Sequence, residues 1–176
     1  MTPREIEEYK ALRATIRERG TARAWMLLVG LVAWAGSTLA TAALAQLPVA
    51  TLLPLLVLAV TFEVTFSLFT GIERVGRYIQ VVYENEPSDR GWESYAMEYG
   101  RSFRIRGSDP LMAAYFWTAT VFNFVPVLTA GPVPLEWGTV GTVHLLFVAR
   151  VFMARREAAR QRAVDLERFR RLKERQ

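Results

Sequence analysis

The chain has 176 residues and a net charge of +5, and its hydrophobic residues, 52% of the total, are concentrated in two blocks. Glu63 is the only charged residue in 24–72, and Glu136 is the only one in 110–149. A soluble domain of this size does not bury two such blocks, and the absence of cysteine excludes a disulfide scaffold, an iron–sulfur cluster and a thiolate metal site. Because about 20 residues cross a bilayer, each block is long enough for two spans.

These blocks predict an all-α polytopic membrane protein, a four-transmembrane-helix bundle built from two hairpins. The membrane domain is expected over 21–154, with a cytoplasmic amphipathic helix before it (1–20) and a long cytoplasmic basic helix after it (155–176). The expected spans lie at about 22–46, 52–76, 110–130 and 136–154, and the cytoplasmic loop at 77–109 joins the two hairpins.

The positions of the basic residues predict the orientation. All 22 Lys and Arg residues lie in 1–23, 74–106 and 150–175, which are the terminal segments, the middle loop and the span ends that adjoin them, and the outer turns near Pro48 and Pro132 contain none. Because Lys and Arg beside a span stay on the cytoplasmic side, both termini are expected in the cytoplasm. The expected location is the inner (plasma) membrane, and the strong excess of Arg over Lys suggests a bacterial source.

The N-terminal helix begins with a capping box, in which Thr2 is the N-cap and Glu5 the reciprocal partner. Apolar residues then recur at helical spacing, and we expect this amphipathic helix to end at Gly20. The small residues Ala43 and Ala45 before Gln46 resemble a signal-peptide cleavage site. The apolar stretch is too long for an ordinary signal peptide, so an uncleaved first span is favoured.

The first span carries small residues on one helical face, which is typical of a surface where another helix packs closely. The face could contact the partner helix of the hairpin or a second copy of the protein, and the sequence leaves both open. Its members are Ala33, Gly36, Ser37 and Ala40.

Glu63 lies near the middle of the second span, where an acidic group needs a protein or water partner. Counting residues from the span ends places two polar side chains, Asn123 and His144, at a similar depth, with Ser67 and Thr120 one turn away. We expect Glu63, Asn123 and His144 to meet. The cluster is either a proton or cation site or a polar cluster that only fixes helix register, and the second interpretation is favoured.

The middle loop contains a predicted short helix from Ser88 to Tyr99 that ends at Gly100. We interpret it as an interfacial helix whose aromatic face lies in the headgroup region, and the alternative is that it packs over the cytoplasmic ends of the bundle. Residues in and near this loop could also bind anionic lipid headgroups, although ordinary positive-inside anchoring explains the arginines as well. The candidates are Arg74, Arg77, Trp92, Arg101, Arg104 and Arg106.

The third span starts at Asp109 and Pro110 and ends at Ala130 and Gly131. The fourth opens near Glu136 and has no Gly or Pro after Gly141, which predicts a long helix that projects into the cytoplasm. Its basic end could contact anionic lipid or be a solvated flank.

The sequence contains no catalytic motif, phosphate loop or metal-ligand spacing, so no cofactor, metal, catalytic residue or nucleic-acid partner is expected. The leading functional hypothesis is a non-catalytic accessory or scaffold subunit of the inner membrane. It would assemble with itself or with a membrane-complex partner and use its cytoplasmic helices to contact that partner or anionic lipids. The alternative is a small proton or cation channel or transporter that uses Glu63, and an intramembrane enzyme comes third.

Overall fold

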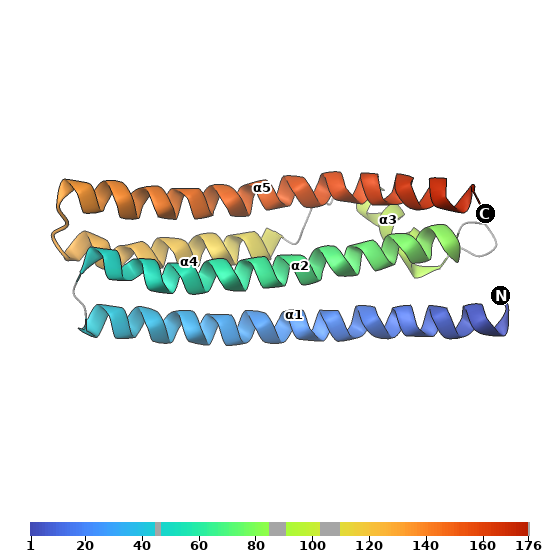
Figure 1. Ribbon diagram of the computed structural model, residues 1–176, viewed down its shortest axis with the longest axis horizontal. Coiled ribbons are helices and arrows are strands. Elements are labelled where there is room, and N and C mark those ends of the chain that lie inside the picture. Colours follow the sequence, from blue (N-terminus) through green and yellow to red (C-terminus); the bar gives the residue numbers. More distant parts are fainter. Residues whose placement is uncertain (45–46, 85–90, 103–109, 176) are drawn as a thin grey trace. The chain divides into compact units, whose positions relative to one another are not determined.

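The computed structural model describes residues 1–44, 47–84, 91–102 and 110–175, and within these ranges the chain is helical with no strand (Figure 1). The all-α class is therefore confirmed. Four of the helices (α1, α2, α4 and α5) are long and apolar enough to cross a membrane. The elements are α1 (Pro3–Leu44), the 3-10 turn η1 (Pro48–Thr51), α2 (Leu52–Val82), α3 (Trp92–Ser102), α4 (Pro110–Thr129) and α5 (Pro134–Lys173).

The helix ends follow local sequence signals. At the start of α1, the Thr2 backbone N–H donates to Glu5 Oε2 (2.6 Å) and the Glu5 N–H donates to Thr2 Oγ1 (3.3 Å), so both halves of the capping box form. Glu136 likewise accepts from the Val133 N–H (3.0 Å) at the start of α5. Gly131, with φ of 63°, follows the end of α4 in the left-handed conformation that glycine adopts without strain.

Two predicted helix ends are wrong. Helix α1 passes through Gly20 without a break and continues to Leu44, and α3 includes Gly100 and ends at Ser102. A glycine inside a helix costs only about 1 kcal/mol relative to alanine, which good helix formers on either side offset. The predicted start of the middle helix at Ser88 lies outside the described residues.

The chain divides into two compact units, which are described separately. Unit 2 consists of Ala24–Phe66 and Asp109–Arg155. Its core is aromatic, because the Phe62 ring contacts Phe66, Phe116 and Phe147 at centroid distances of 5.1 to 6.0 Å. Helices α2 and α4 are the most buried of the apolar helices, whereas only 6% of the apolar window of α1 is buried. The α1 backbone approaches α2 closely at Gly30, where a Cβ would overlap the Thr61 side chain.

Unit 1 consists of Met1–Arg23, Ser67–Ser108 and Arg156–Gln176. Ring contacts join its helices: Tyr9 of α1 meets Tyr83 at 5.6 Å, and Phe169 of α5 meets Tyr78 of α2 at 5.5 Å. Lys173 donates to the Val81 carbonyl oxygen (3.0 Å), where a cation complements the negative end of the α2 dipole. Unit 1 is thus a packed helical module with aromatic contacts of its own.

Candidate functional site

Asn123 is the centre of a hydrogen-bond network inside unit 2. Its side chain is fully buried, and its Oδ1 accepts from the Trp34 indole N–H at 3.3 Å. Its Nδ2 donates to the Thr51 carbonyl oxygen at 2.9 Å and lies 3.0 Å from His144 Nε2. These residues come from α1, η1, α4 and α5, so one asparagine links four elements. We call Trp34, Thr51, Asn123 and His144 the Asn123 network.

The partners in this network determine which atoms carry hydrogen. The Trp34 indole can only donate and the Thr51 carbonyl can only accept, which fixes the orientation of the Asn123 amide. His144 Nδ1 lies 2.8 Å from the Val140 carbonyl oxygen, so Nδ1 carries the proton. Nε2 is then free of hydrogen and accepts from Asn123. Every hydrogen bond is satisfied when His144 is neutral, whereas a proton on Nε2 would face the Asn123 amino group.

Glu63 does not join Asn123 and His144, which differs from the expectation that the three meet. Its carboxylate forms an ion pair with Arg150 of α5, with Nε 2.8 Å from Oε1 and Nη2 2.9 Å from Oε2. The Arg150 guanidinium also lies 5.7 Å from the Phe62 ring centroid and 5.4 Å from that of Phe66. Half of the Glu63 side chain is exposed. Depth counting missed this partner because an arginine side chain reaches across more than one helical turn.

The remaining residues of the predicted intramembrane cluster have local roles or none. Thr120 is buried, and its hydroxyl donates to the Phe116 carbonyl oxygen of its own helix at 2.6 Å. Ser67 is exposed and belongs to unit 1. Neither side chain therefore has a hydrogen bond to the Asn123 network within the described residues.

A cavity of about 370 Å³ adjoins the Asn123 network in unit 2. Its three threonine hydroxyls donate to backbone carbonyl oxygens three residues earlier, so they present only acceptor lone pairs to the cavity. The cavity is lined by Thr41, Ala42, Leu47, Thr51, Pro126, Thr129 and Ala130.

In unit 1, ion pairs join α2 to α5. The Glu73 carboxylate binds Arg77 (3.0 Å) within α2 and Arg162 (2.5 Å) on α5. Asp165 on α5 binds Arg74 at 3.3 Å. Of the five arginines considered for lipid headgroups, two lie on α2: Arg77 is 8% exposed and faces protein, while the side chain of Arg74 is more than half exposed. Arg74 therefore joins α2 to α5, whereas the ion pair and hydrogen bonds of Arg77 stay within α2.

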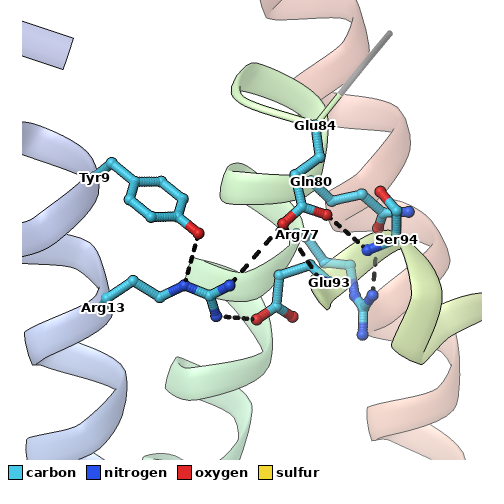
Figure 2. Close-up of polar contacts among 7 residues, drawn as sticks. All are labelled: Tyr9, Arg13, Arg77, Gln80, Glu84, Glu93 and Ser94. Atoms are coloured by element: carbon cyan, nitrogen blue, oxygen red, sulfur yellow. Dashed lines mark hydrogen bonds and ion pairs between the residues drawn. The ribbon is translucent and has the colours of Figure 1, made fainter. Parts of the chain in front are cut away.

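Charged residues also hold α3 in unit 1 (Figure 2). Glu84, which follows α2, accepts from the Glu93 N–H (3.3 Å) and the Ser94 N–H (2.7 Å), so it caps the N-terminus of α3. Arg13 of α1 binds the Glu93 carboxylate at 2.7 Å and donates from Nε to the Tyr9 hydroxyl at 3.0 Å. We call Tyr9, Arg13, Glu84 and Glu93 the α3 cluster.

The other residues considered for lipid contact lie on or after α3. Trp92 is 70% exposed. Arg101 belongs to α3, but its side chain is outside the described part of the chain, as are Arg104 and Arg106. Of these four residues, Trp92 is the one whose side chain the structure describes, and it lies on an open surface.

The small-residue face of α1 has room for another helix. Ala33, Gly36 and Ala40 are exposed, and Ser37 is half-buried. A Cβ added at Gly36 would meet nothing within 4 Å, in contrast to Gly30 on the same helix. The sequence left two packing partners for this face: the hairpin helix and a second copy of the protein. The hairpin helix, α2, contacts α1 at Gly30 and does not cover the surface around Gly36.

No group of three or more potential metal ligands occurs among the described residues. Comparison with known proteins found no matching family model, no similar curated protein and no similar solved structure. The site must therefore be interpreted from its own geometry.

Sequence reasoning found Asn123 and His144 but missed the residues that complete their contacts. Trp34 was one of several aromatic residues in an apolar span, and the Thr51 acceptor is a backbone atom that no sequence pattern marks. Glu84 was also missed, because it lies eight residues before the first residue of α3, beyond the reach of a local capping signal.

Proposed function

We propose that the chain is an integral inner-membrane protein with four spans and acts as a non-catalytic accessory or scaffold subunit. The observation that carries this proposal is a buried hydrogen-bond network in unit 2 that joins its helices through Asn123. The Asn123 network links four elements with every hydrogen bond satisfied, which is how polar groups stabilise helix packing in lipid.

The lengths of the helical segments in unit 2 support a membrane location. At 1.5 Å per residue, 24–44, Pro110–Thr129 and 134–155 are about 31, 30 and 33 Å long. The second segment reaches about 30 Å when η1 is added to 52–66. Each length matches the hydrocarbon core of about 30 Å. We therefore place the inner ends of the spans at the boundary between the units, which shortens the second span from the predicted 52–76.

This placement changes the environment of Glu63. It puts the carboxylate one helical turn from the inner end of its span rather than at mid-bilayer, where Arg150 can draw it toward the headgroups. A membrane channel or transporter that uses Glu63 stays a prediction, and Glu63→Gln tests it by pH-dependent flux in liposomes. Flux that falls several-fold while the protein stays assembled would favour the channel over the scaffold.

Cysteine labelling tests the topology, because the native chain contains no cysteine. Val133→Cys lies at the exposed outer turn and Glu174→Cys at the exposed end of unit 1. A membrane-impermeant maleimide should label Val133→Cys in intact cells and Glu174→Cys only after permeabilisation. Labelling of Glu174→Cys in intact cells would overturn the proposed orientation.

Self-assembly through α1 is tested by substitution on its open face. Gly36→Leu should reduce the oligomer seen by crosslinking, since a bulky side chain keeps two helix backbones apart. The monomer should keep its stability, because nothing in unit 2 lies within 4 Å of a Cβ at Gly36. A wild-type protein that is monomeric and without a partner in native membranes would contradict the scaffold proposal.

A further inference from the structure

The cavity beside the Asn123 network lies at the ends of two helices. Thr41 belongs to the last turn of α1, and Pro126 and Thr129 belong to the last turn of α4. The cavity volume of about 370 Å³ falls in the range of clefts that hold small organic molecules. A single dehydrated metal ion would leave most of this space unfilled, so the ligand that fits is a molecule of several heavy atoms.

The polar side chains that line the cavity are hydrogen-bond acceptors. The hydroxyls of Thr41, Thr51 and Thr129 donate to backbone carbonyl oxygens at 3.0, 2.7 and 3.0 Å, so each oxygen presents lone pairs rather than hydrogen to the cavity. Pro126 has no N–H, so the Phe122 carbonyl oxygen, which points toward it along α4, lacks its usual helix donor. A ligand must therefore bring hydrogen-bond donors of its own.

The charge at this end of unit 2 favours a cation. The last four carbonyl groups of a helix have no N–H partner within that helix, and they carry the negative end of its dipole. Basic side chains often complement that end, but neither α1 nor α4 has a basic residue in its last turn. The sequence has no Lys or Arg in 24–73 or 107–149, and these two ranges contain every lining residue that the structure describes. The negative ends of two helices thus meet at the cavity with no cation from the same stretch of chain to complement them.

We propose that this cavity binds a primary ammonium group. Such a group combines positive charge with three N–H donors, which match the acceptor oxygens of the three threonines. A quaternary ammonium group has no N–H and is usually bound by aromatic rings, and none of the described lining residues is aromatic. Soluble amines and ethanolamine lipid headgroups share this chemistry. The site goes beyond the scaffold function and depends only on the geometry of unit 2.

Ethanolamine and choline are matched probes, because choline carries methyl groups where ethanolamine has N–H donors. Saturation-transfer NMR measures their binding to the full-length protein in a maltoside detergent, which contains no amine. Ethanolamine should bind saturably, and choline should bind at least about tenfold more weakly, since a hydrogen bond to a charged group contributes about that factor. Equal binding of the two probes would overturn the proposal.

Substitution of two threonines shows whether the binding occurs in the cavity. Thr41→Val and Thr129→Val, combined in one protein, keep the side-chain volumes and remove two acceptors, so the affinity for ethanolamine should fall about tenfold or more. Thr38→Val is the matched control: its hydroxyl also donates to a carbonyl oxygen of α1, at 2.8 Å, but it is not among the described lining residues. Helical circular dichroism checks that each variant is folded. Unchanged affinity in the folded double variant would refute the assignment to this cavity.

Native mass spectrometry distinguishes the two sources of the ammonium group. The protein is released from micelles that contain equal amounts of phosphatidylethanolamine and phosphatidylcholine. Preferential retention of phosphatidylethanolamine that disappears in the double variant identifies a lipid headgroup, whereas ethanolamine binding without a lipid preference identifies a soluble amine. The absence of both ethanolamine binding and lipid preference would overturn the proposal. No assembly partner is needed in either measurement, so failure of this inference and failure of the scaffold proposal are separate results.

Discussion

Replacing Asn123 by leucine tests whether the Asn123 network holds unit 2 together. The substitution keeps a similar volume at a fully buried position and removes hydrogen bonds to Trp34, Thr51 and His144. Hydrogen bonds between membrane helices contribute about 0.6 kcal/mol each on average, so three of them contribute about 2 kcal/mol. The Trp34 indole and the Thr51 carbonyl also lose their partner, which adds to the expected loss.

The free energy of unfolding is measured by titrating the detergent-solubilised protein with SDS and following helical circular dichroism. Thr120→Val is the matched control, because the Thr120 hydroxyl bonds only within its own helix, one turn before Asn123. We expect Asn123→Leu to lower the free energy of unfolding by about 2 kcal/mol and Thr120→Val to change it by less than about 0.5 kcal/mol. Equal effects of the two substitutions would refute the reasoning.

A double-mutant cycle with His144→Leu isolates the contact between the two side chains. If His144 accepts from Asn123, the two substitutions should be non-additive by about 0.5 to 1 kcal/mol. Additive effects would mean that the pair does not interact in the folded protein, and would contradict the assignment of the neutral His144 tautomer.

Three further predictions concern separate features. Glu84→Ala should speed amide hydrogen exchange in the first turn of α3 about fivefold, since an N-cap contributes about 1 kcal/mol. Exchange there should not change in Glu167→Ala, which removes an exposed ion pair of α5. Gly30→Ala should destabilise the protein by about 1 to 3 kcal/mol through overlap with α2, whereas Gly36→Ala should be neutral or slightly stabilising. SDS titration gives the free energy of unfolding of both variants, and a Gly36→Ala protein less stable than the Gly30→Ala protein would contradict this prediction. Burial of the hydroxyl raises the pKa of Tyr83 to about 12, and the nearby Glu8 carboxylate adds to the shift. Folding favours the neutral phenol. The contribution of Tyr83 to the free energy of unfolding is therefore fully present below pH 10 and is lost as the pH rises toward 12. The 295 nm absorbance difference between wild type and Tyr83→Phe should titrate near 12, and a midpoint near 10 would show that the hydroxyl is exposed.

The sequence was a good guide to the helices because their signals are local. The capping box at Thr2, the glycine at Gly131 and the long apolar blocks each act within a few residues of the chain. The same local rules failed at Gly20 and Gly100, because a glycine weakens a helix without ending it when the flanking residues favour helix.

The candidate site was predicted in part. Residue counting along the helices placed Asn123 and His144 at one depth, and these two residues meet. It also placed Glu63 there, but depth alone does not specify the direction in which a side chain faces or how far its partner reaches. The ion pair with Arg150 depends on the rotation of α2 and α5 about their axes, which is set by packing around Phe62.

The sequence by itself determined that this is a helical protein with four apolar segments and that its Lys and Arg residues lie outside the apolar parts. Hydropathy and charge belong to individual residues, so their pattern along the chain can be read without a structure. Only the tertiary structure decided which polar groups are partners: Asn123 with Trp34 and His144, Glu63 with Arg150, and Glu84 with the first turn of α3. Each pair joins groups far apart in the chain or bonds to a backbone atom. Such pairs form only when packing sets the separation and rotation of the helices, which local sequence rules do not encode.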